Sequence, residues 1–221
     1  MRAGIAALLL AYVLSQFYRA FLAVLAPVLS TELGTTAASL ASASGWWFLA
    51  FAAMQLPIGA ALDRYGPRLT SALLMAVGAG GAALFAAATN VLQIKIAMAL
   101  IGVGCSPVLM AAYFIFARQY PPALFGTLAG VTIGIGALGN VASALPLSAA
   151  VAAFGWRPTV AGLAGLTGLV ALAILILVRD PPRLAGGSKG ALLDLLRMPA
   201  IWPILAMMAV CYTPIAALRG F

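Results

Sequence analysis

A succession of apolar stretches, each long enough to cross a lipid bilayer, restricts the fold of this chain more than any other feature. The hydrocarbon core of a bilayer is about 30 Å thick, and a helix needs roughly 20 apolar residues to cross it. Because lipid offers no hydrogen bonds to an exposed backbone, such stretches are expected to be helices. Six stretches meet this length and a seventh reaches the last residue; they are residues 5–29, 43–62, 69–89, 92–117, 124–150, 158–178 and 199–221.

The composition agrees with a protein that lies in a membrane. Hydrophobic residues make up 65% of the 221 positions and charged residues 7%, whereas a soluble domain is about 45–50% apolar and about 25% charged. The net charge of +8 does not indicate a nucleic-acid partner, because the basic residues stand at the ends of apolar stretches instead of clustering on one face. We therefore expect an all-α, integral, multi-pass membrane protein surrounded by the lipid bilayer.

The distribution of lysine and arginine predicts how the chain is inserted. Cytoplasmic loops carry an excess of these residues. With the N-terminus in the cytoplasm, the outside segments hold only Lys95 and Arg157, and the other basic loop residues lie inside. The inside residues are Arg2, Arg64, Arg68, Arg118, Arg179, Arg183, Lys189 and Arg197. We expect a cytoplasmic N-terminus and a location in the cytoplasmic (inner) membrane.

The connection between the second and third stretches carries a specific motif. It reads Gly59-Ala-Ala-Leu-Asp63-Arg64-Tyr65-Gly66-Pro67-Arg68. An excess of positive charge alone predicts neither the acid nor the two glycines in this loop. The segment resembles the signature loop of the major facilitator superfamily, G-x-x-x-D-R-x-G-x-R, and lies between the helices where that family carries it. Gly155-Trp156-Arg157, before the sixth stretch, is a weaker feature of the same family.

The resemblance implies that this loop acts at the cytoplasmic gate of a transporter. Asp63, Arg64 and Arg68 would then be gating residues and not substrate ligands. Gly59 is expected to let the helix end pack closely, and Gly66 to allow a tight turn. Asp63 is an anion near a helix end, where it could cap the N-terminus of a neighbouring helix.

The resemblance also implies a fold and a domain organisation. Residues 1–178 would form the N-terminal six-helix bundle of such a transporter, built from inverted 3+3 repeats. Residues 179–198 would be a cytoplasmic linker, and residues 199–221 the truncated seventh helix, which begins the C-terminal bundle. Because members of this family have about twelve helices, we expect a fragment whose missing partner is the C-terminal half. A natural short protein with a seventh helix just long enough to span is the alternative.

Two arginines lie within apolar stretches at matching positions. Residues 11–21 and 211–221 share a tyrosine, an arginine and a phenylalanine at equal spacing, which aligns Arg19 with Arg219. A guanidinium in a bilayer is costly and normally faces protein or a watery cavity, and its planar fork suits phosphate or carboxylate. The pair resembles the two arginines that hold phosphate in the organophosphate:phosphate antiporters of this superfamily. We therefore expect Arg19 and Arg219 to bind a small anionic substrate.

Other polar side chains within the apolar stretches are candidates for the same substrate cavity. Tyr12 and Gln16 share a helical stripe with Arg19, although they are equally explained as packing residues that satisfy each other. The remaining candidates lie deep within the second, fourth and fifth stretches; they are Gln55, Tyr113 and Asn140. Each could line the cavity, or equally make an interhelical hydrogen bond worth about 0.6 kcal/mol.

The fifth stretch contains a row of glycines. Gly126, Gly130 and Gly134 follow one another at four-residue spacing, and Gly136 and Gly139 come next. Small residues at this spacing let helix backbones approach closely in lipid. We expect tight helix packing along this row, and no binding role.

The predicted function is secondary active transport of a small organic or inorganic anion by alternating access. Two alternatives remain open: transport of a neutral, cationic or metal substrate, and a non-transporting membrane scaffold or assembly module. We expect no enzyme, no catalytic residue, no cofactor and no resident metal, because the chain has no histidine and no cofactor-binding loop. Met207, Met208 and Cys211 admit a copper-site interpretation, but methionine in an apolar helix is usually a packing residue.

Overall fold

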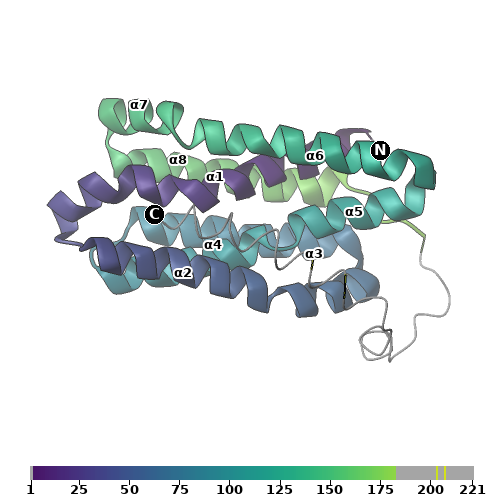
Figure 1. Ribbon diagram of the computed structural model, residues 1–221, viewed down its shortest axis with the longest axis horizontal. Helices are drawn as coiled ribbons and strands as arrows, with labels where there is room; N and C mark the ends of the chain where they lie inside the picture. The colour runs from purple at the N-terminus through teal and green to yellow at the C-terminus, as the bar shows by residue number, and fades with distance from the viewer. Residues whose placement is uncertain (1, 183–202, 204–206, 208–221) are drawn as a thin grey trace. The chain divides into compact units, whose positions relative to one another are not determined.

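The secondary structure that the computed structural model describes is helical, which confirms the predicted all-α class. The described residues are 2–182, Pro203 and Met207. Residues 2–177 form helices joined by short connections (Figure 1). The helices are α1 (Arg2–Leu33), α2 (Ala37–Ala53), α3 (Gln55–Ala86), α4 (Val91–Cys105), α5 (Val108–Gln119), α6 (Pro122–Ala142), α7 (Leu145–Phe154) and α8 (Trp156–Leu177).

Prolines explain why three of the predicted stretches are divided between two helices. Pro57, Pro107 and Pro146 lack the backbone N–H that a helix interior needs, and a proline ring clashes with the carbonyl group four residues earlier. The preceding helices α2, α4 and α6 end within four residues of these prolines. Helices α4 and α5 still make one span of membrane length, Val91–Gln119, as do α6 and α7, Pro122–Phe154.

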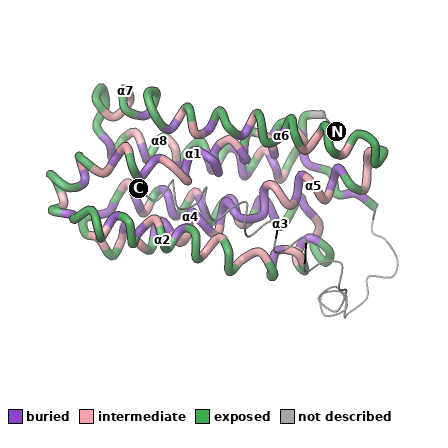
Figure 2. The backbone as a smooth tube through the Cα atoms, in the orientation of Figure 1, coloured by how far each residue is buried: buried purple, intermediate pink, exposed green. Residues whose placement is uncertain are grey.

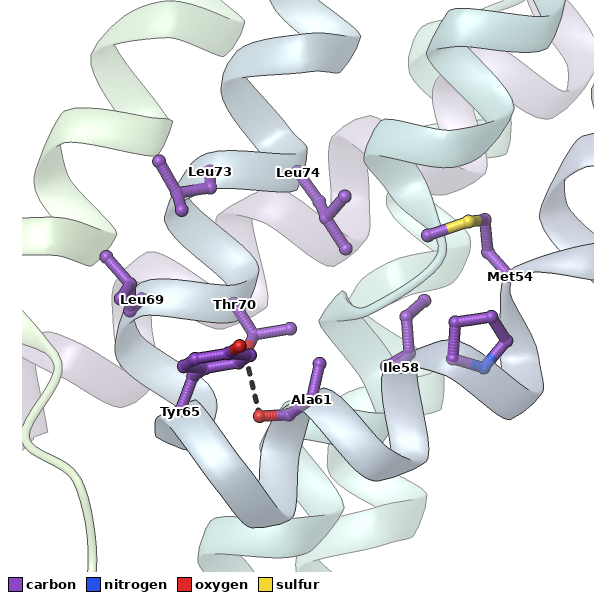
Figure 3. A pocket seen from close by; sticks show the side chains of 9 residues that line it. Met54, Ile58, Ala61, Tyr65, Leu69, Thr70, Leu73 and Leu74 are labelled. Atoms are coloured by element: carbon purple, nitrogen blue, oxygen red, sulfur yellow. Dashed lines mark hydrogen bonds between the residues drawn. The ribbon is translucent and has the colours of Figure 1, made fainter.

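Gly66 divides helix α3 into two limbs. Its φ of 85° and ψ of 164° are not helical, so residues 55–65 form a first limb and residues 67–86 a second limb. The two limbs lie against each other, and the Thr70 hydroxyl donates to the carbonyl oxygen of Ala61 at 3.3 Å (Figure 3). Helix α2 with the first limb corresponds to the predicted stretch 43–62, and the second limb to the predicted stretch 69–89.

Helix α1 carries much of the core. It contacts helices α2, α4, α5, α6, α7 and α8, and buried residues recur along it (Figure 2). Its most deeply buried side chains recur at the three-, four- and seven-residue steps of one helical face. They are Leu8, Ala11, Tyr18, Phe21, Leu25 and Leu29. Helix α3 packs mainly against α4 and α8, which places α8 next to both α1 and α3.

The glycine row of helix α6 does not pack tightly along its whole length, contrary to the expectation from the sequence. A Cβ atom added at Gly126, Gly130 or Gly134 would meet no described atom within 4 Å. A Cβ atom added at Gly136 would collide with the Tyr12 ring, and one at Gly139 with the backbone of α1. Only the last two glycines therefore bring α6 close to α1.

The unit that contains these helices is Met1–Pro181. The predicted linker 179–198 and the predicted seventh helix 199–221 lie outside the described residues, apart from 179–182, Pro203 and Met207. Their boundaries stay predictions.

Candidate functional site

Arg19 lies in the middle of helix α1 and faces aromatic side chains of helix α2. The guanidinium carbon is 5.2 Å from the centroid of the Trp47 ring, 5.7 Å from that of Phe51 and 6.0 Å from that of Phe48. A guanidinium within about 6 Å of an aromatic face is attracted by the negative potential of the ring. The site of the intramembrane charge is therefore built from two helices, α1 and α2.

The aromatic side chains of α2 are held in place by packing. The Trp47 and Phe51 rings are stacked, with centroids 5.0 Å apart and an interplanar angle of 15°. Gly102 of α4 lies directly against the Trp47 backbone, and a Cβ atom there would collide with the Trp47 carbonyl oxygen. Trp47 is 1% exposed, whereas Phe48 is 46% exposed. Arg19 therefore has one buried and one accessible aromatic partner.

Gln16 lies one turn and Tyr12 two turns before Arg19 on helix α1. The Gln16 amide nitrogen donates to the Tyr12 hydroxyl at 2.8 Å, and both side chains are buried. The amide oxygen of Gln16 is also buried, and no described residue donates a hydrogen bond to it. This hydrogen bond is the contact between the two side chains that the sequence suggested as one explanation of the pair. The amide oxygen of Gln16 can still accept a further hydrogen bond.

The other polar candidates lie in separate surroundings. The Gln55 amide donates at 3.0 Å to the carbonyl oxygen of Phe51, across the break between α2 and α3. Tyr113 of α5 makes an edge contact with Phe125 of α6, at 5.6 Å between ring centroids. Asn140 of α6 accepts the Ser143 hydroxyl at its backbone carbonyl, at 2.8 Å. Their roles in substrate binding stay predictions.

Tyr18, the neighbour of Arg19, points away from the aromatic face of α2. Its hydroxyl is 2.8 Å from the hydroxyl of Thr167 on α8, and its side chain is fully buried. A hydroxyl satisfied inside the bundle in this way is a packing contact between α1 and α8.

The predicted gating loop lies at one end of the bundle and is tied to α5. The Asp63 carboxylate and the Arg118 guanidinium are 3.3 Å apart, and the Asp63 side chain is 70% exposed. Arg64 lies over the ring of its neighbour Tyr65, at 5.4 Å from the centroid. The loop thus joins the first limb of α3 to the C-terminal end of α5.

Arg68 and Asp180 join the same loop to the end of helix α8. The Arg68 Nε donates to the carbonyl oxygen of Leu175 at 2.6 Å, and its backbone N–H donates to the Asp180 carboxylate at 2.8 Å. The acid that caps the start of the second limb is therefore Asp180 and not Asp63. Gly66 allows the turn as expected, but Gly59 does not serve close packing here: an added Cβ atom would meet no described atom within 4 Å.

An apolar pocket lies inside the bend of α3. Its volume is about 270 Å³, and Met54, Ile58, Tyr65, Leu69 and Leu73 are among the residues around it (Figure 3). The two limbs form its walls. None of the described residues that line it is charged, and we assign it no part in the proposed anion binding.

The sequence alone did not predict two parts of these sites, the aromatic partners of Arg19 and the contact of Asp180 with Arg68. The aromatic partners of Arg19 were detectable, since Trp47 and Phe51 are four residues apart and share one helical face. Asp180 follows the sixth stretch directly, but no sequence pattern pairs it with Arg68. Arg219 lies outside the described residues, so its pairing with Arg19 stays a prediction. Among the described residues, no group of three or more His, Cys, Asp or Glu side chains could hold a metal ion.

Comparisons with known proteins show the family to which the chain is similar. The sequence profile described as the Major Facilitator Superfamily matches residues 8–218. The probable sulfoacetate transporter SauU of Cupriavidus necator is 27% identical over 148 residues, which are 67% of this chain and 34% of that protein. Together with five helical segments of membrane length among the described residues, the match indicates an integral, multi-pass membrane protein.

Two solved structures share the fold. A bacterial homologue of the human lysosomal transporter Spinster, inward-facing and occupied, is 21% identical with a TM-score of 0.70; the match covers 90% of this chain and 48% of that one. The xylose transporter XylE of E. coli, in an inward-open conformation, is 17% identical with a TM-score of 0.64, over 98% of this chain and 56% of that one. The chain thus spans between 34% and 56% of the length of these three relatives.

Proposed function

Because this chain belongs to the Major Facilitator Superfamily, we propose that it forms the N-terminal half of a secondary transporter that moves a small organic or inorganic anion by alternating access. Arg19 carries the proposal. It is the cationic side chain in the middle of α1, and the aromatic rings of α2 keep its guanidinium in one place. A positioned guanidinium can donate two parallel hydrogen bonds to a carboxylate, phosphate or sulfonate.

The relative from Cupriavidus necator supports an anionic substrate. It is described as a probable transporter of sulfoacetate, a small molecule with a carboxylate and a sulfonate. A substrate with two anionic groups suits a site that receives one guanidinium from each half of a transporter. We propose that Arg19 binds one of these groups, and that Arg219 binds the other.

The second part of the proposal concerns the loop from Gly59 to Arg68. The contacts of Asp63 with Arg118, and of Arg68 with Leu175, gather three helix ends at one end of the bundle. We propose that this end faces the cytoplasm and that Asp63, Arg64 and Arg68 control its opening. The support is the excess of basic residues in the loops at this end.

Transport by the complete protein in liposomes tests the proposal. Uptake is measured for sulfoacetate, glycerol 3-phosphate and xylose, which represent a dicharged sulfonate, a phosphate ester and a neutral sugar. We expect uptake of one of the two anions and no uptake of xylose. Arg19→Ala should lower the affinity for that anion by about 10- to 100-fold, since a hydrogen bond to a charged group contributes about 1.5–3 kcal/mol.

Two arginine-to-lysine variants separate geometry from charge. Arg19→Lys keeps the charge but loses the planar fork, and we expect it to bind the anion at least severalfold more weakly. Arg179→Lys is the matched control, because Arg179 is exposed beyond the end of α8, and its transport should equal that of the unmodified protein. Unchanged affinity in both Arg19 variants would refute an anion-binding role, and uptake of xylose alone would favour a neutral substrate.

A further inference from the structure

Two turns at opposite ends of the bundle have the same unusual backbone. Gly66 has φ 85° and ψ 164°, and Gly155 has φ 84° and ψ 161°. This region of backbone space is essentially restricted to glycine. Each glycine directly precedes a helix: Gly66 precedes the second limb of α3, and Gly155 precedes α8. The two helices pack against each other.

The residues around the two glycines follow one pattern. Tyr65-Gly66-Pro67-Arg68 and Phe154-Gly155-Trp156-Arg157 both read aromatic, glycine, any residue, arginine. The two segments are 89 positions apart in the sequence. Only the first of them belongs to the predicted gating loop.

The two arginines make reciprocal contacts with the end of the other helix. Arg68 donates from Nε to the Leu175 carbonyl oxygen near the end of α8, at 2.6 Å. Arg157 donates from Nη1 to the carbonyl oxygens of Ala86 and Ala88, at the end of α3, at 3.0 and 2.8 Å. Leu175 lies 89 positions after Ala86, so the shift that relates the arginines also relates their acceptors.

The chemistry of these contacts is that of a helix C-terminus. The last carbonyl groups of a helix have no partner within the helix, and the negative end of the helix dipole attracts a cation. Each arginine satisfies such a carbonyl on the neighbouring helix. The second limb of α3 and helix α8 are therefore fastened to each other at both ends by the same device.

A carboxylate from another segment supports each turn. Asp180, beyond the end of α8, accepts the backbone N–H of Arg68 at 2.8 Å. Glu32, at the end of α1, accepts the indole N–H of Trp156 at 2.7 Å. The Arg157 guanidinium also lies over the Trp156 ring, at 4.3 Å from its centroid. The second turn thus fastens α1, α3 and α8 together at the end opposite to the gating loop.

We propose that residues 154–157 are the counterpart of residues 65–68 at the opposite end of the bundle, and that Arg157 is the residue that holds this end closed. Each arginine acts only at its own end of the helix pair: Arg157 at the end of α3, and Arg68 at the end of α8. Loss of Arg157 opens the end of α3 next to Ala88, and loss of Arg68 opens the end of α8 next to Val178. With both in place, the second limb and α8 move as one rigid pair.

Thiol accessibility at each end tests the proposal without a transport assay. The full 221-residue chain is placed in lipid nanodiscs, with Cys105→Ala and Cys211→Ala to remove the native thiols. Ala88→Cys or Val178→Cys then reports on one end, since Ala88 is 0% and Val178 2% exposed. The rate of labelling by N-ethylmaleimide is measured for each probe in the presence of Arg157→Ala or Arg68→Ala.

We expect Arg157→Ala to raise the labelling rate at Ala88→Cys by about 10- to 100-fold and to change Val178→Cys less than about twofold. The range follows from the strength of hydrogen bonds to a charged group. Arg68→Ala should give the reverse pattern. Equal rises at both probes would show a general loosening, and unchanged rates would show no lock; either result overturns the proposal.

Arg157→Lys keeps the proposal testable if Arg157→Ala is not recovered folded. Lysine retains the charge but is a compact point charge without the planar fork of arginine. We expect an intermediate rise at Ala88→Cys with Val178→Cys unchanged. A rate equal to that of the unmodified chain would count against a specific role of the guanidinium.

Discussion

Arg19 places a positive charge within an apolar helix, and its neighbours determine how that charge is tolerated. Three rings of α2 lie within about 6 Å of the guanidinium. Such contacts each contribute about 0.5–2 kcal/mol, depending on how far the cation is desolvated. They also limit the orientations of the guanidinium, so the aromatic rings both stabilise the positive charge and hold the guanidinium in position.

Replacement of Trp47 tests this positioning role in the complete transporter. Trp47→Leu removes the aromatic face, and we expect about 3- to 30-fold weaker binding of the anionic substrate, from the energy of one cation–π contact. Trp47→Phe keeps a ring and should recover most of the affinity. Titration calorimetry gives the affinity of each variant.

Trp46→Leu is the control for this prediction. Trp46 is adjacent in sequence but 47% exposed, whereas Trp47 is 1% exposed. We expect no change in affinity. Equal losses in Trp46→Leu and Trp47→Leu would mean that the two tryptophans act through general packing of α2.

At the scale of single elements, glycine acts in two different ways in this bundle. Gly66 and Gly155 adopt a backbone conformation that other residues rarely reach. Gly139 instead lies within a helix, where the lack of a side chain lets α6 approach the backbone of α1. The first kind shapes a turn, and the second kind sets the distance between two helices.

The two turn glycines should differ in the cost of alanine. A Cβ atom at Gly66 would lie 2.7 Å from the Asp180 carboxyl group, whereas at Gly155 the nearest described atom, in Pro158, is 3.9 Å away. Gly155→Ala should cost about 1–3 kcal/mol of stability through backbone strain. Gly66→Ala should cost more, because the Asp180 contact is also lost. Thermal unfolding in detergent, compared with the unmodified chain, measures both, and a smaller loss for Gly66→Ala would contradict the geometry.

The two kinds of glycine in α6 give a second comparison. Gly126→Ala adds a methyl group where no described atom lies within 4 Å, so it should raise stability by up to about 1 kcal/mol through helix propensity. Gly139→Ala would push α6 away from α1 and should lower stability by about 1–3 kcal/mol, as overpacking does. The melting temperatures of the two variants should therefore shift in opposite directions.

At the scale of the whole molecule, the helices are joined by two types of contact. Apolar side chains and small residues pack the middle of the bundle, and polar contacts such as Asp63–Arg118 and Glu32–Trp156 join helix ends. The Asp63–Arg118 contact costs little to break, because the Asp63 side chain is exposed and can turn to water. That end of the bundle can therefore open while the middle stays packed, as the proposed alternating access requires.

Asp63→Asn should separate stability from transport. The ion pair with Arg118 is exposed on the Asp63 side, and exposed ion pairs contribute about 0–1 kcal/mol. We therefore expect an almost unchanged melting temperature but a severalfold change in transport rate, if Asp63 controls the gate. Asp63→Glu is the control that retains the charge. A loss of stability in proportion to the loss of transport would assign Asp63 a structural role alone.

The sequence by itself determined the helical class, the membrane location and the family. These follow from local properties: the length of the apolar stretches, and a loop motif whose residues are adjacent in the chain. Arg19 was also identifiable, because a charge within an apolar stretch needs no structure to be recognised. The sequence did not show which prolines interrupt a helix. Pro27 lies within α1 without dividing it, whereas α2 ends four residues before Pro57.

Only the tertiary structure decided which residues meet. Trp47 faces Arg19, Asp180 caps the second limb of α3, and Arg157 reaches the end of the same limb, although each pair is far apart in the chain. Helical periodicity tells which residues share a face, but the neighbour of that face depends on how all the helices pack. The same limit applies to the glycines of α6: their spacing permits close packing, and the position of α1 decides which of them use it.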